Sequence, residues 1–132
     1  MAKHNEIGLN GEDIASQWLK NKDFEIVERN YCKKWGEIDI VARETSKVHF
    51  IEVKTVSYET KQDLEWSVSH ETWRPEENVH VQKQKRLARA IQTWISENRY
   101  EGKWQIDIIA IRLVPDMKYC RLKFLNNIIF EI

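Results

Sequence analysis

Gly36-Glu37-Ile38-Asp39-Ile40 and Ile51-Glu52-Val53-Lys54 are the two stretches of sequence that decide the fold of this chain. Each stretch alternates apolar and polar residues, and the segment between them contains the polar pair Thr45-Ser46. Apolar residues that recur with a period of two on both sides of a tight turn are typical of a β-hairpin. We therefore predict two antiparallel strands joined by a two-residue loop.

The register of this hairpin predicts a cluster of charged side chains on one face. Residues two apart in a strand share a face, and a loop of two residues sets Asp39 opposite Glu52 and Glu37 opposite Lys54. Directly opposed side chains have Cβ atoms about 4.5–5.5 Å apart. Two carboxylates so close repel each other unless a cation lies between them, and Mg²⁺ takes such oxygens as ligands. The pattern favours a metal-dependent site for phosphodiester cleavage. The alternative is the ordinary solvated face of an antiparallel sheet.

Several blocks along the chain repeat the order and spacing of a known family. The matching blocks are Gly8, Gly11-Glu12, Ala15, Arg29-Asn30, Gly36-Glu37-Ile38-Asp39, Glu52-Val53-Lys54-Thr55, Lys83 and Arg86-Leu87. In these blocks, which span most of residues 5–113, the chain resembles the YraN-like family of bacterial proteins, which is placed in the PD-(D/E)XK nuclease superfamily beside the archaeal Holliday-junction resolvases. The chain departs from many members of that family at Val56, where they have arginine, and in a longer stretch between Lys54 and Lys83.

This resemblance implies roles for individual residues. Asp39 and Glu52 would be metal ligands, Lys54 the catalytic lysine, and Glu12 the acidic residue that a helix places near the metal. It also implies Mg²⁺ or Mn²⁺ as the cofactor and DNA, branched or otherwise structured, as the substrate. On periodicity alone Glu12 is a solvated glutamate at the edge of the apolar stripe of its helix.

Composition restricts the class of protein. A chain of 132 residues is predicted to form one domain, residues 1–132, and 42% hydrophobic with 32% charged residues is typical of soluble proteins. No apolar run approaches the roughly 20 residues of a membrane span, and residues 1–6 lack the apolar core of a secretory signal. We therefore expect a cytoplasmic protein without membrane contact. Cys32 and Cys120 do not make a disulfide scaffold, and the four histidines lack zinc-ligand spacing.

Charge is balanced overall but not locally. The 21 basic and 21 acidic residues give a net charge of zero, which argues against a protein that coats DNA. Residues 82–92, however, contain four basic residues and no acid, a pattern that predicts local phosphate contacts. A basic helix face exposed to water is the alternative. The first of these residues lies on the apolar side of its helix and is expected to point toward the sheet. The four are Lys83, Lys85, Arg86 and Arg89.

The remaining pattern predicts an α/β fold of restriction-endonuclease type, with a mixed central sheet of about five strands flanked by helices. The strand at 104–113 follows a helix and is predicted to pair in parallel with an earlier strand. The apolar edge at 119–130 favours a homodimer that covers it. The other predicted elements are helices at 5–20 and 81–97 and a strand at 24–31.

Residues 57–80 lack a clear period and are predicted to form a long loop that leaves the sheet near the site. Its residues Trp66, Trp73 and Arg74 would either stack on unpaired bases or, for the tryptophans, anchor the loop to the body of the protein.

Three functions are compatible with these observations. The predicted function is that of a metal-dependent DNA endonuclease. The first alternative is a non-catalytic DNA-binding module that uses the basic residues of 82–92. The second is a protein-interaction module in replication or repair, whose long loop and C-terminal edge bind a partner.

Overall fold

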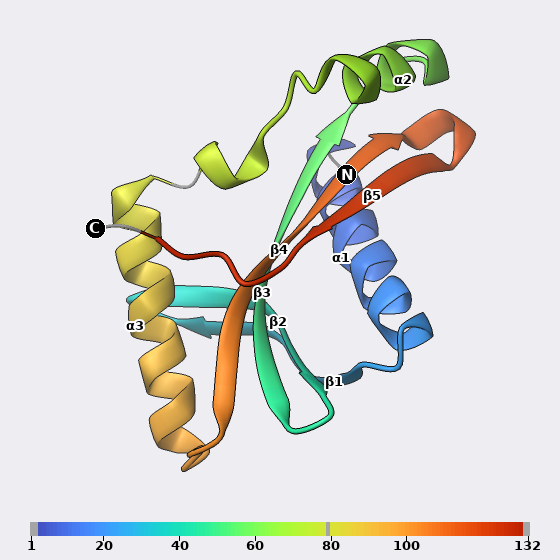
Figure 1. Cartoon of the computed structure of the whole chain (residues 1–132). Coiled ribbons are helices and arrows are strands. Elements are labelled where there is room, and N and C mark those ends of the chain that lie inside the picture. The colour runs from blue at the N-terminus through green and yellow to red at the C-terminus, as the bar shows by residue number, and fades with distance from the viewer. Residues whose placement is uncertain (1–2, 79, 131–132) are drawn as a thin grey trace.

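The computed structural model describes residues 3–78 and 80–130, and for residues 3–10, 76 and 78 it describes the backbone alone. The helices are α1 (Lys3–Asn21), α2 (Lys61–His70) and α3 (Val81–Glu97), with short 3-10 turns η1 (Pro75–Asn78) and η2 (Pro115–Met117). The strands are β1 (Glu25–Lys33), β2 (Gly36–Glu44), β3 (Lys47–Ser57), β4 (Lys103–Val114) and β5 (Tyr119–Leu125). Their arrangement is shown in Figure 1.

The described strands form one mixed sheet in the order β1-β2-β3-β4-β5. β3 and β4 pair in parallel, while the other neighbours are antiparallel. Helices α1 and α3 lie on opposite sides of this sheet (Figure 1). The predicted α/β fold is confirmed: a mixed five-stranded sheet flanked by helices, consistent with a restriction-endonuclease-like core.

The predicted hairpin is present, and its register agrees with the prediction as far as the ladder extends, which does not include the predicted pair of Glu37 with Lys54. Glu44 pairs with Lys47, and the antiparallel ladder continues in the same register to Ile40 and Ile51. Thr45, the first loop residue, adopts a φ of 56°. A loop with a positive φ at this position matches the right-handed twist of the two strands that it joins.

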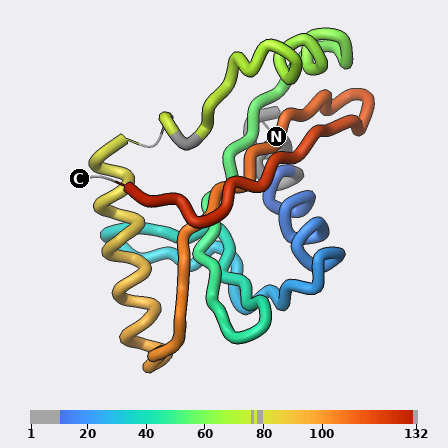
Figure 2. Tube along the Cα trace, viewed as in Figure 1, coloured from blue at the N-terminus to red at the C-terminus, as the bar shows by residue number. Residues whose placement is uncertain are grey.

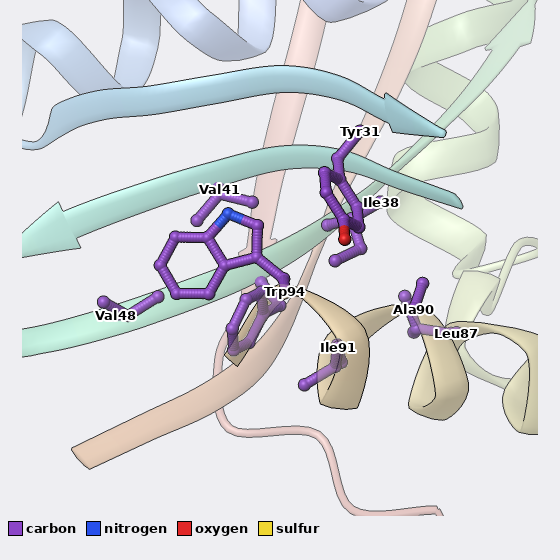
Figure 3. Close-up of a cluster of buried hydrophobic side chains, with 9 residues drawn as sticks. Tyr31, Ile38, Val41, Val48, Leu87, Ala90, Ile91 and Trp94 are labelled. Carbon is purple, nitrogen blue, oxygen red and sulfur yellow. The ribbon is translucent and has the colours of Figure 1, made fainter. Parts of the chain in front are cut away.

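Two apolar clusters fill the two sides of the sheet. On the side of α3, Trp94 and Ile91 pack against apolar residues of β1, β2 and β3, among them Tyr31 and Val41 (Figure 3). Phe50 of β3 belongs to the same cluster. The rings of Phe50 and Trp94 meet edge to face at 5.4 Å between centroids. On the side of α1, residues such as Leu19 pack against the alternate positions of the same strands. Alternation along β3 therefore sends Phe50 toward α3 and its neighbour Ile51 toward α1.

The prediction of a long loop at 57–80 was wrong, because this segment contains α2 and η1. Thr60 caps α2 by accepting a hydrogen bond from Asp63 N at 3.0 Å. Only Leu64 and Ser67 of this helix are buried, so the sequence carries no apolar stripe with a helical period. Trp66 is 56% exposed and does not anchor the segment.

The C-terminal part of the chain returns across the sheet. β5 is an edge strand, as predicted, but it ends at Leu125. The following residues run back toward α3 (Figure 2), and Ile128 N donates a hydrogen bond to Ile106 O at 2.7 Å. A second hydrogen bond holds the same segment: Asn127 N donates to the carboxylate of Asp107, which is fully buried, at 2.8 Å. None of the helices in the described part of the chain has the length and apolarity required to cross a bilayer.

Candidate active site

The candidate site lies where the ladder between β2 and β3 ends. The last backbone pair is Ile40 with Ile51, so Asp39 and Glu52 are the next residues in register. Beyond this pair, a side chain of β2 accepts a hydrogen bond from the backbone of β3: Asp39 Oδ2 accepts from Val53 N at 2.8 Å. The two strands thus separate at the position where the predicted acidic pair is located.

Two lysines neutralise the acidic side chain on β3. Glu52 is only 4% exposed. Its Oε1 lies 2.5 Å from Lys83 Nζ and 3.5 Å from Lys54 Nζ. A buried carboxylate needs such partners, because removing it from water costs several kcal/mol unless it is paired. As expected from its place on α3, Lys83 reaches the site from the helix on this side of the sheet.

The environment shifts the pKa of three of these groups. Burial, together with the negative charge of Glu52, raises the pKa of Asp39 to about 8, although the hydrogen bond from Val53 opposes this shift. Burial and the adjacent Lys83 lower the pKa of Lys54. Burial also disfavours the charged form of Lys83, but hydrogen bonds to Glu52 and Lys54 outweigh it, so that the pKa of Lys83 is raised. Strongly shifted carboxyl and amine groups in one place are characteristic of functional sites.

The acidic pair has the chemistry of a site for a hard divalent cation. Its donors are carboxylate oxygens, which Mg²⁺ and Mn²⁺ prefer, and the repulsion that raises the pKa of Asp39 is relieved by a cation. In the part of the chain that the structure describes, no three His, Cys, Asp or Glu residues are close enough together to hold a metal. The residues present therefore fit a magnesium-type ion that takes few protein ligands, and not a closed zinc site.

Helix α1 reaches this part of the sheet through Gly11. A Cβ atom on Gly11 would lie 2.2 Å from Thr55 Oγ1, so α1 packs on β3 at a distance that only glycine permits. Because Thr55 follows Lys54, this contact brings the next residue of the helix, Glu12, near the site.

Glu12 lies beside β1 and not among the lysines. Arg29 Nη2 is 3.8 Å from its Oε2. With its amide oriented to satisfy both groups, Asn30 donates to both oxygens of Glu12 at 3.2 Å. Asn30 lies within β1 and adopts a φ of 53° at this position. The charge of Glu12 contributes to the raised pKa of Asp39, which places it within electrostatic reach of the acidic pair.

The other three predicted DNA-binding residues form a separate basic cavity. Lys85, Arg86 and Arg89 line a cavity of about 450 Å³ with Gln82 and two residues that the sequence analysis missed, Lys34 and Trp35. The Arg89 guanidinium lies 5.3 Å from the centre of the Trp35 ring. A lysine next to an aromatic residue at the β1–β2 turn was the signal that could have identified them.

This basic cavity adjoins a second cavity that reaches Glu52. The second cavity, of about 350 Å³, includes Glu37, Glu52 and Lys83 in its lining. Gln82 and Arg86 line both cavities. The cationic surface of α3 is therefore continuous with the candidate site.

Comparison with known proteins places the chain in a family. Residues 11–111 match the model of Uncharacterised protein family UPF0102. The chain belongs to the UPF0102 family. The UPF0102 protein of Campylobacter lari is 35% identical over 119 residues, which cover 85% of this chain and 93% of that protein. The UPF0102 protein of Dictyoglomus turgidum is 32% identical over 123 residues, 92% of this chain and 95% of its own length. The UPF0102 match includes Glu12, the acidic pair, both lysines and α3, but it ends before Arg112.

Proposed function

We propose that this UPF0102 member is a metal-dependent endonuclease of the PD-(D/E)XK superfamily that hydrolyses phosphodiester bonds in branched or otherwise structured DNA. The observation that carries the proposal is the convergence of Asp39, Glu52 and Lys54 where β2 and β3 separate. These are the residues that the resemblance to YraN-like proteins assigns to catalysis, and the register of the hairpin brings them together independently of that resemblance.

Each residue has a role in this proposal. The carboxylates of Asp39 and Glu52, with the Val53 carbonyl, would hold Mg²⁺ or Mn²⁺, and Glu12 would hold water in the outer part of the site. When bound, such an ion supplies a hydroxide nucleophile and offsets the charge that grows on the phosphate. Lys54, whose pKa is lowered by burial, would position the attacking water and stabilise the developing anion.

The basic cavity on α3 supports binding of a nucleic-acid backbone. In the described residues, no ion pair engages Lys34, Lys85, Arg86 or Arg89, so these cations are available to phosphates. Such contacts supply much of the affinity of proteins for DNA. Because the cavity adjoins Glu52 and Lys83, a strand held there would pass the acidic pair.

Calorimetric titration with Mg²⁺ and Mn²⁺ tests the proposal directly. We expect the wild type to bind about one or two ions per chain, and we expect Asp39→Asn and Glu52→Gln to lose this binding. Glu101→Gln removes an exposed acid elsewhere and serves as the control. Lys54→Met should lower the rate of DNA cleavage while metal binding is retained. Equal cleavage of branched DNA by the wild type and Asp39→Asn would refute the proposal.

A non-catalytic DNA-binding module is the second candidate. It is favoured by the ion pair of Lys83 with Glu52, which neutralises the carboxylate without a metal. This candidate predicts that the protein retains DNA in the presence of a chelator, that Asp39→Asn and Glu52→Gln bind DNA as the wild type does, and that no cleavage occurs with either metal.

A further inference from the structure

We propose that a separate cavity on the same face of the sheet, lined by Trp73, Arg112 and Lys123, binds a phosphate group of the substrate strand next to the cleaved bond. This inference rests on the proposed nuclease function for the source of the phosphate, but the positive charge of the cavity is independent of it.

The cavity lies one strand away from the catalytic lysine. It has a volume of about 380 Å³ and lies between the α2–η1 segment and strands β4 and β5. Ala110 lines it, and Ala110 pairs with Lys54 of β3 on one side and with Lys123 of β5 on the other. Paired residues of neighbouring strands point to the same face of a sheet. The single methyl group of Ala110 therefore leaves space between two lysine side chains.

The burial of Arg112 is the second observation that favours an anion in this cavity. Arg112 is only 9% exposed, and its Nε donates a hydrogen bond to Ser67 Oγ at 3.0 Å. Its guanidinium carbon lies 5.5 Å from the centre of the Trp73 ring. Among the side chains that the structure describes, no carboxylate is within ion-pair distance of Arg112. A buried cation without an anion is costly, so buried charges are normally paired.

Arg121, the neighbour of Arg112 on β5, differs from it in exposure and in ion pairing. Arg121 pairs with Arg112 across β4 and β5, but Arg121 is half exposed and lies 2.7 Å from Glu65 of α2. Of these two arginines, the exposed one has a carboxylate partner, and the buried one has none among the described side chains. This difference points to a ligand that completes the environment of Arg112.

The lining favours a phosphodiester over a free phosphate. The planar guanidinium of Arg112 matches two phosphate oxygens, and Lys123 adds a second positive charge. Glu71 and Arg74 also line the cavity, and the charge of Arg74 is partly offset by Glu77 at 3.6 Å. The net positive charge is therefore modest and suits the single negative charge of a diester. Trp73 offers an apolar surface to the adjoining sugar or base.

The family model covers only part of this cavity. The UPF0102 match ends at residue 111, so Arg112 and Lys123 lie outside it. The wall opposite the sheet comes from the segment that separates Lys54 from Lys83. In the order of the strands, Arg112 on β4 and Lys123 on β5 lie on the opposite side of the acidic pair from the β1–β2 turn that lines the basic cavity of α3. A strand that spans both cavities would cross the candidate site.

The test measures binding of fluorescein-labelled single-stranded and branched DNA in the presence of a chelator. We expect Lys123→Gln and Arg112→Gln each to weaken binding about three- to tenfold and to lower the slope of log K against log salt by roughly 0.7 for a single strand. The control is Lys20→Gln, an exposed lysine of α1 on the other side of the sheet. Lys123 is exposed, so Lys123→Gln decides the test even where Arg112→Gln unfolds.

A second arm separates this inference from the nuclease proposal. Thermal unfolding is followed with increasing inorganic phosphate, for the wild type and the same variants. If phosphate stabilises the wild type but not Lys123→Gln, while no DNA binds, the anion cavity stands and the nuclease proposal fails. The opposite result is that Lys123→Gln and Arg112→Gln both fold and bind DNA and phosphate as well as the control Lys20→Gln does. In that case the cavity is not an anion site, whatever the activity of the protein.

Discussion

Asp39 combines a partly buried carboxyl group with an immediate acidic neighbour, and this has a consequence for stability. Its pKa is about 8 in the folded protein, compared with an ordinary value of 3.8. The folded state therefore favours the neutral carboxyl. The resulting stabilisation is fully present below about pH 4 and is lost as the pH rises through about 8.

Asp39→Asn imitates the neutral carboxyl at every pH. In the presence of a chelator, we expect this variant to match the wild type at about pH 4 and to exceed it at about pH 9, by on the order of 1–3 kcal/mol in the free energy of unfolding. Denaturant unfolding at both pH values measures the difference. Asp116→Asn, at an exposed position in η2, is the control and should show no such gain. A gain of equal size at both pH values would mean that Asp39 is not held in its neutral form.

The predictability of the site differed from residue to residue. Alternation and a two-residue loop were sufficient to place Asp39 near Glu52, because both depend on local backbone geometry. Glu12 could be assigned only through the resemblance, since its approach depends on the packing of α1 at Gly11. Arg112 was missed because it lies inside a run of apolar residues that indicates a buried strand. A single arginine in such a run was itself the signal, but its lack of a carboxylate partner is visible only in three dimensions.

At the scale of elements, the docking of α3 on β2 depends on Gly36. A Cβ atom on Gly36 would lie 2.1 Å from the backbone oxygen of Arg86, which cannot move aside as a side-chain tip can. The same turn of α3 carries Lys83 to Glu52. The position of this lysine is therefore coupled to the absence of a side chain at residue 36.

Gly36→Ala is expected to push α3 away from β2. Overpacking of this kind costs about 1–3 kcal/mol, and we expect a loss of that size in the free energy of unfolding together with weaker DNA binding. Chemical denaturation and the DNA titration measure the two effects. Gly102→Ala is a comparison at a glycine where the close atoms belong to the end of the Tyr100 side chain, so a smaller loss is expected. An unchanged Gly36→Ala protein would show that the helix tolerates displacement.

Elements with a strong apolar period were predicted from the sequence, and those without one were not. The predicted bounds of α3 agree with the structure because its buried residues, among them Leu87, Ile91 and Trp94, recur with the helical period. In contrast, α2 buries so little of its surface that no period reveals it. Its beginning had a local signal: Thr60 followed three residues later by Asp63, which is a capping pattern.

For the whole molecule, the distribution of charge matters more than its sum. The net charge is zero, but the cavity on α3 gathers Lys34, Lys85, Arg86 and Arg89. A neutral protein with one basic surface binds DNA in a defined orientation and not by general attraction.

The paired substitution Lys85→Gln/Arg89→Gln tests this view. We expect it to weaken DNA binding in chelator at least tenfold and to reduce the salt slope on duplex DNA by about 0.9 for each phosphate that the variant no longer neutralises. The control is Lys20→Gln/Lys22→Gln, which removes the same charge from the region of α1. Equal effects of the two pairs would indicate that net charge, and not the cavity, governs binding.

The parallel pairing of β3 with β4 bears on how this protein folds. Glu52 lies beside Ile108, and the chain between them forms α2 and α3. Contacts between residues so distant in sequence form slowly, because a long loop must close first. The hairpins of β1, β2 and β3 involve local contacts only, so we infer that they assemble early, with their carboxylates still facing water. Lys83 of α3 and Arg112 of β4 are then the last to reach their places beside these strands. A nascent chain would therefore acquire its cation-binding and anion-binding surfaces only in the final step of folding.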